Sequence, residues 1–156
     1  MRIGVTGAKG FIGTHLISAI KDKGRVVTLP RRKGFPGKGE LKRFVEGTDL
    51  IFHFGGVNRD TDENILGGNI ISTSRLVESI LSYGKSSARL IFASSAQVYS
   101  WTNYRRPIRE TLKANPDTVY GVSKQSAENL IKNSGIPFMI LRMSNVYGPG
   151  CRPNYN

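Results

Sequence analysis

A tyrosine and a lysine four positions apart are the residues whose types and spacing most clearly suggest chemistry. Tyr120 and Lys124 fall in a stretch with helical apolar spacing, so both side chains project from one helix face. A neighbouring ammonium favours phenolate and lowers a tyrosine pKa from its usual value of about 10. Such a tyrosine could move a proton near neutral pH. Because this spacing also occurs on solvated helix faces, the pair needs support from the rest of the chain.

A serine gives part of that support. The apolar run 90–93 predicts a strand, and Ser95 follows it at the carboxyl edge. Open α/β sheets bind their ligands at this edge. Ser95 could be an ordinary turn residue or a group that hydrogen-bonds a reacting oxygen.

A glycine-rich loop predicts a phosphate-binding turn. Gly7, Gly10 and Gly13 are spaced Gly-x-x-Gly-x-x-Gly between the predicted strand 3–5 and the predicted helix 11–20. Glycine permits the tight turn and close backbone approach to a pyrophosphate, and the helix N-terminus supplies unpaired N–H groups. The strand before the loop and the helix after it favour this interpretation over a simple turn.

The elements that must position these residues alternate along the chain. Short apolar runs predict strands at 3–5, 26–29, 50–54, 90–93 and 138–141, and helical spacing predicts helices at 11–20, 37–46, 63–83 and 118–133. This pattern predicts an α/β fold, a Rossmann-type doubly wound parallel sheet in three layers. Between Arg31 and Asp49 there is little room for a strand plus a crossover helix, so the third strand is expected to be short or absent.

Together these motifs resemble the extended short-chain dehydrogenases/reductases, in particular the NAD-dependent epimerase/dehydratase family of nucleotide-sugar epimerases and reductases. Tyr120 follows Ser95 by 25 positions, which matches that family. The resemblance implies that Ser95, Tyr120 and Lys124 are catalytic. Tyr120 would exchange a proton with a sugar hydroxyl, Lys124 would tune Tyr120 and hold the nicotinamide ribose, and Ser95 would bind the reacting oxygen.

The resemblance also implies a set of binding residues. His53-Phe54-Gly55-Gly56 matches a small-residue cofactor loop, Asn69 matches an asparagine that supports the active-site helix, and the run 141–150 places Asn145 against the nucleotide-sugar. For His53, Asn69 and Arg142 a structural role is an equally open interpretation. The implied cofactor-binding residues are Gly7, Lys9, Gly10, Phe11, Ile12, Gly13, Arg31, Arg32, Phe54, Gly55, Gly56, Asn69, Tyr120 and Lys124.

The sequence departs from the family in two informative places. Arg31 stands where NAD-binding members carry an acid, so NADP is favoured and NAD remains possible. Lys9 in the glycine loop also favours NADP. Alternatively, Pro30 could redirect the loop and leave the arginine side chains in water. Ala96 and Gln97 occupy the positions of the Asp-Glu pair of dehydratases, which leaves epimerisation or 4-keto reduction. The alternative function is a non-catalytic NADP-binding sensor or interaction module.

Bulk composition narrows the remaining classes of domain organisation, partner and localisation. The 156 residues suit one cofactor-binding domain, 1–156, and the polar Gly/Pro-rich stretch from Tyr147 onward leads us to expect a missing or truncated substrate domain. The exposed apolar surface this leaves predicts a homo-oligomer. The net charge of +12 comes without a nucleic-acid-binding motif, so no nucleic acid partner is expected. One cysteine and no long apolar run predict a cytoplasmic chain without membrane contact, and no metal site is predicted.

Overall fold

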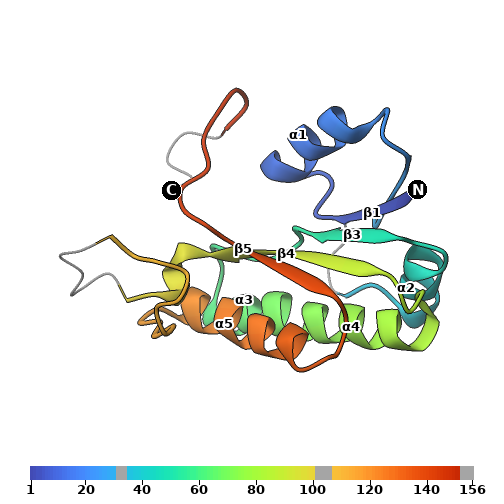
Figure 1. Cartoon of the computed structure of the whole chain (residues 1–156). Coiled ribbons are helices and arrows are strands. Elements are labelled where there is room, and N and C mark those ends of the chain that lie inside the picture. The colour runs from blue at the N-terminus through green and yellow to red at the C-terminus, as the bar shows by residue number, and fades with distance from the viewer. Residues whose placement is uncertain (31–34, 101–106, 152–156) are drawn as a thin grey trace.

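The computed structural model describes residues 1–30, 35–100 and 107–151, and its centre is a parallel sheet of five strands (Figure 1). The strands lie in the order β2-β1-β3-β4-β5. Their bounds are β1 Arg2–Thr6, β2 Arg25–Thr28, β3 Leu50–His53, β4 Arg89–Ser95 and β5 Phe138–Met143. All neighbouring pairs are parallel, which confirms the predicted Rossmann-type sheet.

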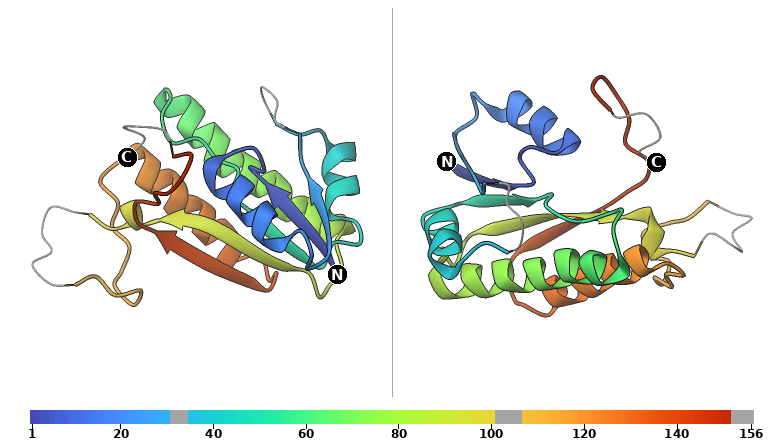
Figure 2. Two further views of the ribbon diagram at one scale, coloured as in Figure 1. Left: turned by 90° about the horizontal axis from the view of Figure 1, so that it is seen from above. Right: turned by 180° about the vertical axis from the view of Figure 1, so that it is seen from behind.

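Helices cover both faces of the sheet, as predicted (Figure 2). Helix α1 (Phe11–Ile20) lies on one face, and the chain that follows β5 rises on the same side. On the other face lie α2 (Lys38–Val45), α3 (Asp62–Leu66), α4 (Ser72–Tyr83) and α5 (Val119–Lys132). Among the described residues between β2 and β3, α2 is the only regular element, so the third strand expected to be short or absent is not seen there.

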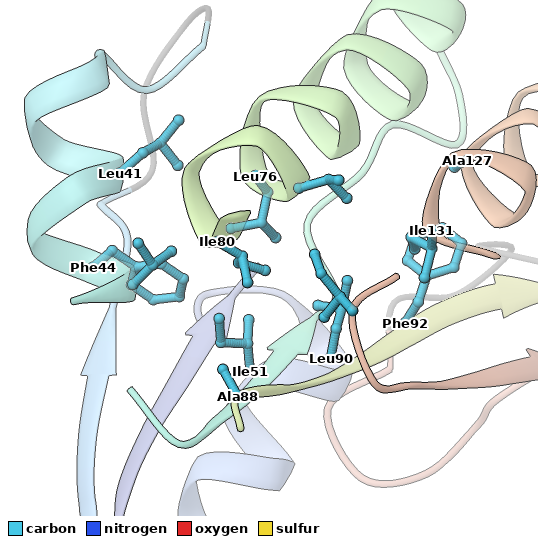
Figure 3. Packing of buried hydrophobic residues seen from close by; sticks show 13 residues of the cluster. Leu41, Phe44, Ile51, Leu76, Ile80, Ala88, Leu90, Phe92, Ala127 and Ile131 are labelled. Carbon is cyan, nitrogen blue, oxygen red and sulfur yellow. The ribbon is translucent and has the colours of Figure 1, made fainter. Parts of the chain in front are cut away.

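The core fills the space between the sheet and the helices α2, α4 and α5 (Figure 3). Leu90 and Phe92 of β4 are fully buried at its centre, each removing enough apolar surface from water to contribute roughly 2 kcal/mol. The buried side chains around them include Leu41, Phe44, Ile51, Leu76, Ile80 and Ile131. This core fixes β3 and β4, whose carboxyl ends carry residues of the predicted site.

The predicted helix 63–83 is divided by a π-helical turn at Gly67–Ile71, which separates α3 from α4. Gly67 and Gly68 are weak α-helix formers, so this segment yields readily to tertiary packing. The wider turn leaves Asn69 only 2% exposed, among partners described below. Such π turns often occur at functional sites. The apolar periodicity of residues 63–83 does not predict this one.

Helix α5 begins one residue later than predicted, because Thr118 is its N-cap. The Thr118 hydroxyl accepts a hydrogen bond from the Gly121 N–H at 3.0 Å. This cap fixes the first turn of α5, which carries Tyr120. The same helix turn packs against the loop that follows β4, as shown below.

Candidate active site

Two loops meet at the point where the strand order reverses, between β1 and β3. The glycine loop follows β1, and residues 54–57 follow β3. Gly7 has a φ of +70°, and a Cβ on it would lie 2.6 Å from the Gly55 nitrogen. A Cβ on Gly13 would lie 2.2 Å from the Gly7 carbonyl oxygen. Only glycine fits these two positions, and ligands of open α/β sheets bind in such a crevice.

Helix α1 begins directly after the glycine loop, and the first N–H groups of a helix have no partner within the helix. Gly10 is its N-cap and provides no side-chain hydrogen bond to the first turn. A glycine cradle beside an uncapped helix N-terminus suits a dinucleotide pyrophosphate. Lys9 is exposed in the loop, whereas Phe11 and Ile12 are half-buried in the first turn of α1. These predicted residues therefore lie together in the glycine loop and the first turn of α1, and their contact with a cofactor stays a prediction.

Tyr120 and Lys124 lie together on α5, as predicted from their spacing. The Lys124 side chain is buried, and its residue is only 5% exposed. Its Nζ lies 4.6 Å from the ring centroid of Phe92 and 5.9 Å from that of Tyr120. Burial lowers the pKa of Lys124 to about 8, while the nearby Glu128 carboxylate opposes the shift. A buried ammonium next to a tyrosine is an uncommon arrangement outside functional sites.

Ser95 is the last residue of β4, one position inside the strand rather than after it. Its Oγ accepts a hydrogen bond from the Gln97 N–H at 3.2 Å. The turn that follows packs directly onto α5, since a Cβ on Gly121 would lie 2.2 Å from the Gln97 carbonyl oxygen. The loop of Ser95 and the first turn of α5 are therefore adjacent.

Asn69 joins α5 to the loop that follows β3. Its Nδ2 donates to Ser123 Oγ at 2.9 Å and to the Val57 carbonyl at 2.8 Å. Its Oδ1 accepts from the Val57 N–H at 2.9 Å, and a Cβ on Gly56 would lie 2.6 Å from that oxygen. Both amide protons are thus used within the protein, which favours the supporting role over direct cofactor contact. The contact of Asn69 with a cofactor stays a prediction.

The chain beyond β5 reaches the same side of the sheet. Asn145 is exposed shortly after β5, and a Cβ on Gly148 would lie 3.6 Å from Phe11 Cζ. The loop that contains the predicted sugar contact therefore approaches the start of α1. Arg31 and Arg32, on which the predicted NADP preference depends, lie outside the described residues.

A carboxylate that was not predicted from the sequence, Glu128, holds the C-terminal half of α5 against β4 and β5. Glu128 is fully buried and accepts hydrogen bonds from Ser94 Oγ at 2.6 Å, Arg142 Nε at 2.9 Å, Arg142 Nη2 at 2.7 Å and Lys132 Nζ at 3.0 Å. Burial alone would raise the pKa of Glu128, but these hydrogen bonds outweigh burial and hold the pKa below its usual range. Arg142 thus has a structural role within β5. The clue was the four-residue spacing from Lys124, which puts Glu128 on the same buried helix face.

Comparisons with known proteins agree with this geometry. The model of the NAD dependent epimerase/dehydratase family matches residues 3–156. The chain is 34% identical to the UDP-2-acetamido-2,6-beta-L-arabino-hexul-4-ose reductase of Pseudomonas aeruginosa over 161 residues, which cover 100% of this chain and 38% of the relative.

Two solved structures have the same architecture. A UDP-glucuronic acid 4-epimerase from Bacillus cereus in complex with NAD superposes with a TM-score of 0.82 at 28% identity, over 98% of this chain and 59% of that protein. RMD from Pseudomonas aeruginosa complexed with NADPH gives a TM-score of 0.80 at 26% identity, over 97% of this chain and 55% of that protein. The chain thus spans between two fifths and three fifths of these relatives. It belongs to the NAD dependent epimerase/dehydratase family.

Proposed function

We propose that this chain is the NAD(P)-binding N-terminal portion of a nucleotide-sugar epimerase or 4-ketoreductase, with Ser95, Tyr120 and Lys124 as its catalytic residues. The observation that carries the proposal is the buried Lys124 ammonium beside Tyr120, at the edge of a glycine-lined crevice. Keeping an ammonium charged at neutral pH while it is buried costs free energy. The charged Lys124 therefore lowers the stability of the fold, and its presence is better explained by chemistry.

The roles follow from chemical type and position. Tyr120 exchanges a proton with the hydroxyl at sugar C4, and the Lys124 ammonium favours the phenolate form. Ser95, at the end of β4, donates a hydrogen bond to the reacting oxygen and stabilises its developing charge. Asn145 contacts the nucleotide-sugar from the loop after β5. A nicotinamide dinucleotide, when bound, supplies the hydride acceptor or donor.

The glycine cradle fits a dinucleotide, and we favour NADP over NAD. Arg31 and Arg32, which follow β2 in the sequence, would pair with a 2′-phosphate, and Lys9 adds positive charge. The relatives use both cofactors, since the Pseudomonas RMD structure contains NADPH and the Bacillus epimerase contains NAD. An NADP preference would favour the reductase, because an epimerase recycles a retained cofactor.

Calorimetric titration with NADPH and NADH in parallel tests the binding part. Tighter NADPH binding that is lost in the Arg31→Ala, Arg32→Ala double variant supports the NADP assignment. Tighter NADH binding overturns that assignment and favours the epimerase. A chain that binds neither dinucleotide contradicts the proposed function.

Replacing Tyr120 by Phe tests the catalytic part. In the full-length enzyme we expect turnover of a UDP-4-keto sugar with NADPH to fall by at least about a hundredfold, with dinucleotide affinity unchanged. Tyr83→Phe, on the exposed end of α4, is the matched control. Turnover that survives in Tyr120→Phe contradicts the assignment. Tight dinucleotide binding without turnover in the full-length protein favours a non-catalytic NADP-binding module instead.

A further inference from the structure

A chain of hydrogen bonds runs through the buried side chain of His53, and its direction can be deduced link by link. The Thr73 hydroxyl lies 2.6 Å from the Asn69 carbonyl oxygen and 3.0 Å from His53 Nε2. A carbonyl oxygen only accepts, so the single hydroxyl proton of Thr73 points to Asn69. Thr73 must therefore accept from His53, which places a proton on His53 Nε2.

The other half of the imidazole follows from its charge state. Burial, assisted by the positive charge of Lys124, lowers the pKa of His53 to about 3, so the ring is neutral and carries one proton. With that proton on Nε2, Nδ1 accepts, and Thr6 Oγ1 at 2.7 Å is its donor. Thr6 Oγ1 in turn accepts the Gly55 N–H at 3.0 Å. Every donor and acceptor in the series is thereby used once in a consistent direction.

The ends of this chain lie at the two loops and the helix of the proposed site. Thr6 immediately precedes the glycine loop, and Gly55 lies in the loop after β3. Asn69, at the far end, donates through its side chain to Ser123, whose hydroxyl donates to the Tyr120 carbonyl at 2.7 Å. The chain connects the backbone of both cofactor loops to the π turn and to α5.

We propose that His53 is a positioning residue, which in its Nε2–H tautomer sets the spacing of the glycine loop, the loop after β3 and the Tyr120/Lys124 helix through Thr6 and Thr73. The functional meaning of this inference rests on the proposed function, whereas the hydrogen-bond chain itself does not. The hydrogen-bond chain needs a hydroxyl-bearing residue on each side of the imidazole, because each hydroxyl must both accept and donate a hydrogen bond. Positioning of this kind matters because small displacements of binding loops weaken ligand binding.

The tautomer is directly measurable because the chain has only two histidines, His53 and His15. We expect ¹⁵N spectra of histidine-labelled protein at pH 7 to show one imidazole as a pure Nε2–H tautomer. His15→Gln assigns the signals, since His15 is exposed on α1. An Nδ1–H tautomer or a protonated ring at His53 would overturn the inference.

The positioning role is tested by Thr73→Val, which keeps the shape of the side chain and removes the hydroxyl, against Thr73→Ser, which restores it. We expect Val to accelerate amide exchange at Gly55 and Val57 and to weaken dinucleotide binding, each by about tenfold, with Ser close to the unmodified chain. Equal behaviour of the two variants in both measurements refutes positioning through Thr73. If the unmodified chain binds no dinucleotide, the proposed function fails, while the tautomer and exchange data still decide this inference. A Val variant that does not fold leaves Thr6→Val against Thr6→Ser as the equivalent pair.

Discussion

Replacing Lys124 by Met should stabilise the chain while it removes a catalytic group. Methionine keeps the apolar stem length and removes the buried charge. Below pH 8 the ammonium is charged in both the folded and the unfolded chain, and burial shifts its pKa from the usual 10.5 to about 8. The folded chain therefore bears a constant cost at neutral pH, which amounts to about 3 kcal/mol for a shift of this size.

The pH dependence of this stability cost follows from the direction of the pKa shift. Because the pKa of Lys124 is lower in the folded chain, the unfolded chain binds the extra proton, and stability falls as pH decreases from the unfolded value to about 8. Raising the pH removes the cost again. The advantage of the Met variant should thus shrink from about 3 kcal/mol at pH 7 to about 2 kcal/mol at pH 9 and about 1 kcal/mol at pH 10.

Urea unfolding at these three pH values, without cofactor, measures the difference. Lys23→Met, at an exposed position after α1, is the control and should change stability by less than about 0.5 kcal/mol. A Lys124→Met variant that is less stable than the unmodified chain at pH 7 would contradict a destabilising buried charge at this position. A stability difference that does not decline as the pH rises from 7 to 10 would contradict the lowered pKa of Lys124. Dinucleotide titration of the same variant should show weaker binding, because Lys124 is proposed to hold the nicotinamide ribose.

Three further predictions address the parts of the structure around this lysine. Gly13→Ala would place a Cβ 2.2 Å from the Gly7 carbonyl oxygen and should weaken dinucleotide binding, measured by calorimetry, at least about tenfold. Gly10→Ala is the control, because its Cβ would lie 3.2 Å from the same oxygen and should weaken binding less. Because burial lowers the pKa of His53 to about 3, lowering the pH from 7 to 5 should cost about 2 kcal/mol of stability. That loss should be absent from the His53→Gln variant, and an equal loss in both chains would contradict the assignment. Glu128→Gln leaves Arg142 without its buried counter-charge and should cost roughly 3 kcal/mol in urea unfolding; an unchanged midpoint would show that the pair is unimportant.

Most of the fold could be predicted because its signals are local. Buried strands such as Leu50–His53 read as short apolar runs bounded by turns, and the α1 and α2 helices were predicted to within one residue at either end. The spacing of Tyr120 and Lys124 correctly placed both on one face of α5. These features depend on periodicities that the sequence displays directly.

The features that were missed depend on contacts between distant segments. The π turn at Gly67–Ile71 arises where Asn69 meets Val57 and Ser123, residues 12 and 54 positions away. The buried Glu128 cluster likewise requires β4, α5 and β5 to be assembled. The direction of hydrogen bonds at His53 could not be deduced without knowing that Thr6 and Thr73 lie on either side of the ring. None of these has a periodic signature.

The placement of these contacts explains how α5 can keep Lys124 buried. A helix that carries a buried ammonium would lower its free energy by rotating or shifting until the charge reaches water. One turn of α5 is held through Ser123 by Asn69, and the next is held through Glu128 by Ser94 and Arg142. Lys124 lies between these two attachments, so rotation would break hydrogen bonds on both sides of it. The buried polar groups around the site therefore oppose the relaxation that the lysine itself would favour, and they keep the ammonium beside Tyr120, where the proposed chemistry needs it.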